Sequence, residues 1–117
     1  MNYEELCESV KKADLKIRFV GVINSKGRLV AGGMVSKIKP LEDEKKDEML
    51  FMELVLRVRM RKEFNLDLGP VKFALSYREK VIIMSFPIKN DILMVSMESK
   101  AEFEKIAFKI LKIVESI

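Results

Sequence analysis

The segment at residues 42–64 contains no glycine or proline and is rich in the helix-favouring residues Met, Leu, Glu, Lys and Arg. Its last part, LRVRMRKEF, alternates apolar and basic side chains at residues 56–61, which is the period of a half-buried strand. A strand there would leave residues 43–54 without a structure. The segment therefore predicts one long helix.

This helix would have two apolar faces. At about 100° per residue, the faces hold Met49, Met52, Leu56 and Met60 on one side and Phe51, Leu54 and Val58 on the other. A sheet can cover one face, but a domain of 117 residues has little else to cover the second, and self-association is the simplest cover. We expect the adaptable Met-rich face at an interface and the stiffer face in the core; the alternative is that both faces are core.

Basic side chains line the borders between these two faces. Arg57 and Arg61 lie on one border, and Arg59 and Lys62 lie on the other. Glu53 precedes Arg57 by one helical turn, an arrangement that favours an ion pair worth about 0.2–0.5 kcal/mol. Because the helix dipole attracts cations to its C-terminal end, the cluster is better explained by helix position than by a phosphate-binding patch or an arginine finger.

Shorter elements flank this segment. Residues 2–14 predict an amphipathic helix, and residues 15–24 and 28–35 predict two strands joined by a turn with a positive φ at Gly27. Residues 65–70 predict the stop of the long helix. Three strands are then predicted at residues 71–77, 80–88 and 91–98, and a final helix is capped by Ser99 with Glu102 completing a capping box. The predicted order is α-β-β-α-β-β-β-α, in a single α+β domain.

The strands differ in their patterns. In the first, Leu15, Ile17, Phe19 and Ile23 would share one side. Gly32 and Gly33 indicate a bulge or a close backbone approach in the second. The strand at 71–77 alternates and is typical of a sheet edge, whereas continuous apolar runs at 81–84 and 92–95 indicate strands covered on both faces.

Composition excludes several classes of function. The chain has no histidine and one cysteine, so neither a Ser-His nor a Cys-His catalytic pair can form, and Cys7 is expected to be a small buried hydrophobe. No P-loop is present, and Asp43, Asp47 and Glu48 are expected to form a solvated helix start rather than a metal site. We therefore predict no catalytic residue, no cofactor and no metal.

Charge and hydropathy bear on location and partners. The net charge of +4 permits nucleic-acid binding without requiring it. No apolar run reaches the roughly 18 residues of a membrane span. The N-terminus carries acids where a signal peptide would carry positive charge, so we expect a cytoplasmic protein.

The order of elements resembles the roadblock (dynein light chain) family of profilin-like folds across nearly the whole chain. VGVINSKGRLVAGG at residues 20–33 looks like the first hairpin of that family, and DILMVSMESKAEFEKIAFKIL at residues 91–111 looks like its last strand and closing helix. The resemblance implies a five-stranded antiparallel sheet with the middle helix on one face and the terminal helices on the other. It also implies a homodimer joined through edge strands, with the middle helices meeting across the two-fold axis.

Family members act as dimeric platforms that bind or regulate small Ras-like GTPases or join larger scaffolds, and the resemblance implies such a non-enzymatic role here. The expected dimer interface comprises Val71, Lys72, Phe73, Ala74, Leu75, Ser76, Tyr77, Met49, Met52, Leu56, Arg59 and Met60. The candidate partner or phosphate contacts are Arg57, Arg61 and Lys62. Two alternatives stay open, a basic nucleic-acid-associated regulator and, by fold analogy only, a small-molecule sensor.

Overall fold

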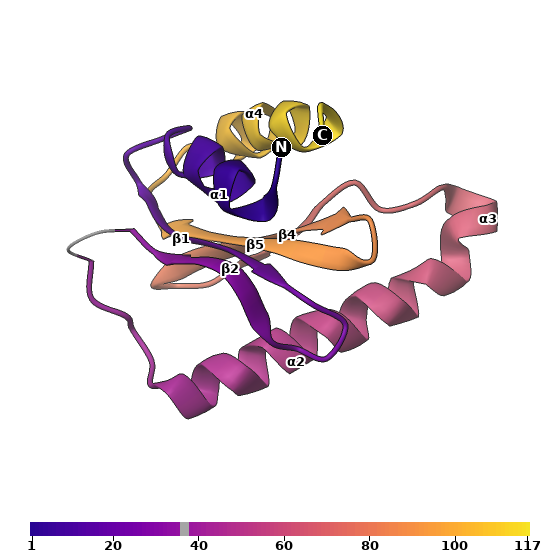
Figure 1. Ribbon diagram of the computed structural model, residues 1–117, viewed down its shortest axis with the longest axis horizontal. Helices are drawn as coiled ribbons and strands as arrows, with labels where there is room; N and C mark the ends of the chain where they lie inside the picture. The colour runs from indigo at the N-terminus through magenta and orange to yellow at the C-terminus, as the bar shows by residue number, and fades with distance from the viewer. Residues whose placement is uncertain (36–37) are drawn as a thin grey trace.

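A five-stranded antiparallel sheet separates two layers of helices in the computed structural model, which describes residues 1–35 and 38–117. The strand order is β2-β1-β5-β4-β3. Helices α1 and α4 lie on one face of the sheet and α2 lies on the other (Figure 1). This arrangement confirms the predicted fold class, with the middle helix on one face and the terminal helices on the opposite one.

The bounds of the elements are as follows: α1 Tyr3–Lys11, β1 Ile17–Ile23, β2 Leu29–Met34, α2 Glu44–Arg61, the 3-10 turn η1 Lys62–Phe64, α3 Asn65–Leu68, β3 Ala74–Tyr77, β4 Val81–Ile88, β5 Asp91–Glu98 and α4 Phe103–Glu115.

The sheet has a hydrophobic core on each face. Alternate residues of the central strands supply both cores, because successive side chains of a strand point to opposite faces. In β5, Leu93 and Val95 join the core beneath α1 and α4, whereas Ile92 and Met94 join the core beneath α2. The continuous apolar runs in β4 and β5 therefore mark strands covered on both faces, as predicted.

The long helix forms, but it ends a few residues earlier than predicted. Asp43 caps α2, accepting a hydrogen bond from the backbone of Lys46, and α2 ends at Arg61 rather than at residue 64. The backbone then continues through η1 and α3 to Leu68, so only the last part of the predicted stop at residues 65–70 lies outside a helical turn. The break comes at Gly69, whose φ of 81° ends the helical path and whose N–H donates to the carbonyl of Asn65 at 2.9 Å.

A bulge in β1 overturns the predicted sidedness of that strand. The pairing of β1 with β5 shifts between Ile17 and Phe19. As a result Ile17 packs beneath α1 and α4 while Phe19 and Ile23 pack beneath α2. One extra residue in a strand reverses the facing of everything before it, and Leu15 lies outside the strand and is fully exposed.

The β1–β2 hairpin confirms the predicted roles of two glycines. Gly27 has a φ of 76°, and the Asn24 side chain accepts hydrogen bonds from the backbone N–H groups of Lys26 and Arg28. Gly32 has a φ of 80°, and a Cβ there would collide with the carbonyl oxygen of Val20. The close approach is thus at Gly32, whereas the register shift between these strands lies elsewhere, at Ile23.

Two further boundaries differ from prediction. The strand predicted at 71–77 is an edge strand as expected, but β3 begins only at Ala74, because the preceding residues follow an irregular path after Pro70. The capping box predicted for Ser99 is wrong: Ser99 lies in a turn after β5, and α4 begins at Phe103. A capping box does occur in α1, between Asn2 and Glu5.

Candidate interaction surface

The outer face of α2 is apolar and uncovered. Phe51, Leu54 and Val58 are buried against the sheet, as predicted. Opposite them, Met49 is 72% exposed, Leu56 50% and Met60 69%. The alternative that both faces are core is therefore wrong for a single copy of the chain. We call Met49, Leu56 and Met60 the α2 ridge; Met52, which is 40% exposed, lies beside them.

An open groove runs along the α2 ridge and is flanked by charge. Its lining consists of Met49, Met52, Glu53, Leu56, Arg57, Met60 and Arg61. The predicted ion pair between Glu53 and Arg57 is present, with 3.6 Å between carboxylate oxygen and guanidinium nitrogen. Acidic side chains lie in the first turn of α2 and basic ones in its last turn, so the helix has opposite charges at its two ends.

Two of the predicted interface residues, Arg59 and Met52, also contact the β1–β2 turn. The guanidinium of Arg59 donates a hydrogen bond to the backbone carbonyl of Ser25, 2.9 Å away in the β1–β2 turn. Met52 packs over Gly27 in the same turn, so that a Cβ on Gly27 would lie 2.9 Å from the Met52 methyl group. Both side chains connect α2 to the hairpin, on the side of the helix that faces the β2 half of the sheet.

The second predicted surface, β3, is an open sheet edge. It pairs only with β4, leaving the backbone groups of its other side without a strand partner in the described chain. Leu75 and Tyr77 are exposed, whereas Val71, Phe73 and Ala74 are half-buried. Lys72 forms an ion pair of 3.7 Å with Glu115 of α4. The edge and the α2 ridge are thus both present, but the ridge lies on the helix side opposite the sheet.

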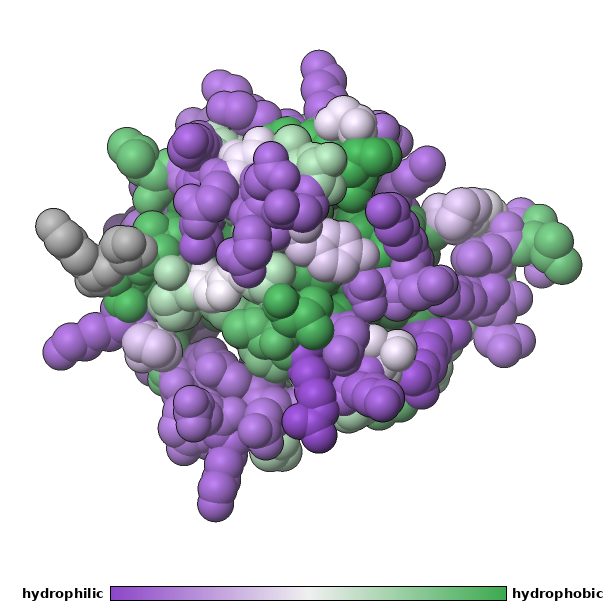
Figure 2. Space-filling view, in the orientation of Figure 1, coloured by the Kyte–Doolittle hydropathy of each residue, from purple (hydrophilic) through white to green (hydrophobic). Residues whose placement is uncertain are grey.

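Sequence reasoning missed several exposed apolar side chains. Phe64, Leu66 and Leu68, beyond the end of α2, are exposed at the far end of the molecule, where Figure 2 shows apolar side chains projecting among hydrophilic ones. Phe108 of α4 is 54% exposed and packs edge-on against Phe73, with ring centroids 5.5 Å apart. Phe108 lies outside the apolar stripe of the last helix, and this position in the sequence could have indicated its exposure.

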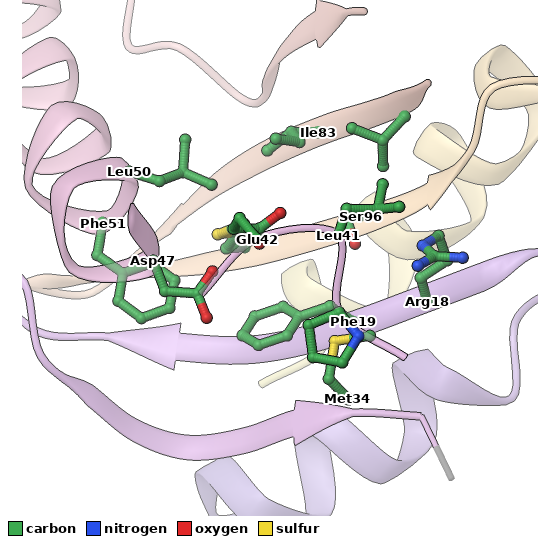
Figure 3. A pocket seen from close by; sticks show the side chains of 13 residues that line it. Arg18, Phe19, Met34, Leu41, Glu42, Asp47, Leu50, Phe51, Ile83 and Ser96 are labelled. Carbon is green, nitrogen blue, oxygen red and sulfur yellow. The ribbon is translucent and has the colours of Figure 1, made fainter. Parts of the chain in front are cut away.

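A small cavity lies between the start of α2 and the sheet (Figure 3). Phe19, Phe51 and Leu50 line it together with Asp47 and Glu42. Its volume of about 60 Å³ has room for a few waters and is far below the roughly 300–1,000 Å³ of organic-ligand sites. This cavity therefore gives no support to the sensor alternative.

The sequence predicted that Asp47 would lie in a solvated helix start. The structure instead places Asp47 half-buried beside the cavity. Burial beside the cavity raises the pKa of Asp47 from its ordinary value of 3.8 to about 7. A hydrogen bond with the Glu42 carboxyl group and the negative charges of Glu42 and Asp43 raise that pKa further in the same direction. Figure 3 shows the Asp47 and Glu42 side chains near one another at the cavity rim.

Cys7 is a buried hydrophobe, as predicted. Its side chain is fully buried in the core beneath α1 and α4. Burial, with a smaller contribution from the negative charge of Glu4, raises the pKa of the thiol to about 11. The thiolate is the reactive form, so this cysteine is unreactive at neutral pH.

Two negative findings concern residues 1–35 and 38–117 alone. They contain no group of three or more Cys, Asp or Glu side chains arranged to hold a metal ion. No helix among them is both long enough and apolar enough to cross a membrane.

Sequence comparison places the chain in one protein family. A family model described as "Family of unknown function (DUF6659)" matches residues 1–116. No curated protein matches the sequence.

Solved structures that resemble the chain include a Roadblock/LC7 domain from Streptomyces avermitilis, with a TM-score of 0.73, 8% identity, and coverage of 99% of this chain and 94% of that one. MglB from Myxococcus xanthus matches with a TM-score of 0.72, 12% identity, and coverage of 97% and 82%. Profilin II from Acanthamoeba castellanii matches with a TM-score of 0.66, 8% identity, and coverage of 98% and 95%. These likenesses show a roadblock-type, profilin-like fold.

Proposed function

The chain belongs to this family of unknown function and has the roadblock fold, and from these premises we propose that it is a non-enzymatic homodimeric interaction module. Its proposed role is to bind or regulate a small Ras-like GTPase, or to join a cytoplasmic scaffold. The observation that carries the proposal is the pairing of an uncovered apolar helix face with an open sheet edge. We assign the chain no catalytic residue.

The homodimer is supported by two surfaces without a partner in a single copy, namely the edge of β3 and the α2 ridge. An unpaired edge strand presents a row of backbone donors and acceptors that readily accept another strand. The α2 ridge exposes three large apolar side chains in a continuous stripe, and such stripes mark association sites. We propose that β3 of two copies pair and that their α2 helices run antiparallel beside one another.

The antiparallel pairing of α2 helices is also favoured by their charges. The first turn of α2 carries the exposed Glu44, and its last turn carries Arg61. In an antiparallel pair the acidic end of each helix lies beside the basic end of the other. Such complementarity adds specificity and fixes the relative orientation of the two copies.

The proposal of a GTPase partner rests on the family resemblance together with the surface of α2. Small-GTPase binding is what the roadblock resemblance implies for a platform of this shape. In the proposed dimer the α2 ridge lies between the two copies, and Arg57, Arg61 and Lys62, exposed or half-buried beside it, would contact an acidic partner surface. A charged rim mainly raises the association rate and is sensitive to salt.

The nucleic-acid alternative is weakened by one contact. Arg59 donates a hydrogen bond to the backbone of Ser25. This contact reduces the number of cations in the basic set that are free to contact phosphates. Binding to nucleic acid that falls steeply with salt would revive this alternative.

The test has two parts. Sedimentation equilibrium at micromolar concentration should show a dimer, and a monomer there would overturn the homodimer. Small Ras-like GTPases encoded by the same organism should then be loaded with GDP or with a non-hydrolysable GTP analogue and passed over the immobilised protein. We expect binding that depends on the nucleotide and is lost in Leu56→Asp, in which the two α2 helices can no longer pair; equal binding by this variant would contradict a partner site formed by the dimer.

The matched control is Leu15→Asp. Leu15 is also an exposed leucine, but it lies in the turn before β1 and belongs neither to the α2 ridge nor to β3. A loss of GTPase binding in this control would point to a general effect of the new charge rather than to the α2 ridge.

A further inference from the structure

An aromatic patch joins the open edge of the sheet to α4, on the face opposite α2. Tyr77 of β3 packs against Phe103, with ring centroids 5.5 Å apart. Phe73, just before β3, packs edge-on against Phe108 at 5.5 Å and an interplanar angle of 88°. The set Leu75, Tyr77, Phe103 and Phe108 is called the β3–α4 patch below.

The aromatic side chains of this patch are more exposed to solvent than is usual for residues of this size. Tyr77 is 64% exposed and Phe108 54%, and Leu75 is exposed as well. The hollow beside Phe108 is lined by Ala101 and Phe103 and is bordered by the charged residues Glu102, Glu104 and Lys105. Exposed Tyr and Phe rings that cluster at one place are typical of the centre of a protein interface.

The register of β3 on β4 settles which way these side chains face. Leu75 lies opposite Met84 and Tyr77 lies opposite Ile82, and both partners belong to the core beneath α1 and α4. Directly opposite residues of an antiparallel pair point to the same face. Ala74 and Ser76, opposite Ser85 and Ile83, therefore face the α2 side.

A second copy of the chain is the occupant that this geometry selects. If two β3 strands pair about a two-fold axis, the pleat allows only registers in which opposite residues share a face. Two such registers pair most of the strand. The first register is centred on Leu75 and places Leu75 against Leu75, and Tyr77 against Phe73, of the other copy. The second is centred on Ser76 and places Leu75 against Tyr77 of the other copy.

In both registers the β3–α4 patches of the two copies meet. Phe108 packs on Phe73, beside the position that the strand of the second copy would take. We propose that the β3–α4 patch is the second half of the homodimer interface, so that the dimer is held on both faces of its joined sheet. This inference rests on the proposed homodimer, to which it adds an aromatic anchor on the side away from α2.

Because the chain contains no tryptophan, a single introduced tryptophan reports directly on the patch. In Phe108→Trp, emission should be red-shifted in dilute protein and blue-shifted in concentrated protein, with a midpoint that matches the dimer dissociation constant from sedimentation. Leu15→Trp, a fully exposed position outside the patch, should show no shift with concentration. An unshifted Phe108→Trp in a protein that sediments as a dimer would overturn the inference.

The energetic test is the double variant Tyr77→Ser, Phe108→Ser, which should weaken the dimer by about ten- to a hundredfold, the loss typical of aromatic anchors at interfaces. Circular dichroism and the thermal midpoint establish that the variant is folded; if it is not, the single variant Phe108→Ala takes its place. Leu15→Ser should leave the dimer unchanged. A dimer equally tight in the double variant overturns the β3–α4 patch alone, whereas a monomeric wild-type chain overturns the homodimer and this inference together.

Discussion

Arg59 of α2 donates a hydrogen bond to the backbone carbonyl of Ser25, and this contact joins the helix to the tip of the β1–β2 hairpin. The two residues are far apart in sequence, and Asn24 and Gly27 shape the turn that presents the carbonyl. Helix and hairpin are thereby fixed relative to one another on the β2 side of the sheet. The other border of α2, with Arg57, has no such connection to a strand among the hydrogen bonds of the described residues.

Replacing Arg59 should therefore affect stability more than replacing Arg57. We expect Arg59→Ala to lower the free energy of unfolding by about 1 kcal/mol, because a hydrogen bond from a charged donor is lost at an exposed site. Urea denaturation of the two variants is the measurement. Arg57→Ala, which loses only an exposed helical ion pair, should cost less than about 0.5 kcal/mol. Equal effects of the two changes would contradict the role assigned to the Ser25 contact.

Gly32 should tolerate substitution far less well than Gly69, although both have a positive φ near 80°. A residue other than glycine with such a φ costs about 1–3 kcal/mol. At Gly32 a Cβ would also collide with the Val20 carbonyl and press on Cys7, whereas at Gly69 nothing lies within 4 Å. We expect Gly32→Ala to cost more than about 3 kcal/mol and Gly69→Ala to cost only the backbone strain.

Thermal and chemical unfolding of both glycine variants would measure this difference. The comparison isolates the close approach of β2 to β1, because φ is nearly the same at both sites. Similar losses at Gly32 and Gly69 would mean that the two strands can move apart to accept a methyl group.

Tyr3 ties α1 to the start of β5 through a hydrogen bond of 2.7 Å from its hydroxyl group to the Asp91 carboxylate. Burial, the hydrogen bond to Asp91 and the charge of Asp91 raise the pKa of Tyr3 from 10.0 to about 12. Between these values the folded protein binds more protons than the unfolded chain, so stability is present below pH 10 and is lost as the pH rises toward 12.

Tyr3→Phe should lower the free energy of unfolding at neutral pH by about 1 kcal/mol, the usual contribution of one hydrogen bond. The spectrophotometric titration of tyrosinate should lose its highest-pH step in this variant, and its stability should decline less steeply in alkali. A variant as stable as the wild type, with an unchanged titration, would show that the Tyr3–Asp91 contact does not form in solution.

Much of the fold could be predicted from the sequence because its signals were long or locally strong. The two faces of α2 repeat over several turns, and the runs in β4 and β5 are continuously apolar, so neither depends on a single residue. The bulge in β1 was not predictable in this way. Nothing in IRFVGVI marks the shift that separates the facing of Ile17 from that of Phe19, because the pairing with β5 decides it.

Helix ends were predicted less well for a related reason. Ser99 and Glu102 have the spacing of a capping box, but residues 99–102 form the turn that leads from β5 to α4, so the helix begins only after them. In the candidate site, the α2 ridge could be predicted because its residues recur at helical spacing on the face opposite the core residues. The contacts of Phe108 and Arg59 were missed, since each depends on a residue distant in sequence.

Asp47 should make stability depend on pH in the acidic range. Its pKa is about 7 in the folded protein against an ordinary value of 3.8, because it is buried near the cavity and faces Glu42 and Asp43. Between these values the folded state binds more protons than the unfolded state, so this group makes the protein less stable as the pH rises through that window. Arg18, the cationic group lining the same cavity, does not offset these causes.

Asp47→Asn should therefore be more stable than the wild type at about pH 8, where the wild-type carboxylate is charged, and lose this advantage at about pH 4. Guanidinium denaturation at both pH values is the measurement, and Glu44→Gln, an exposed change in the same helical turn, is the matched control. An Asn variant with the same advantage at both pH values would show that the gain comes from packing. One less stable than the wild type at the higher pH would show that the charged carboxylate is well accommodated at the start of α2.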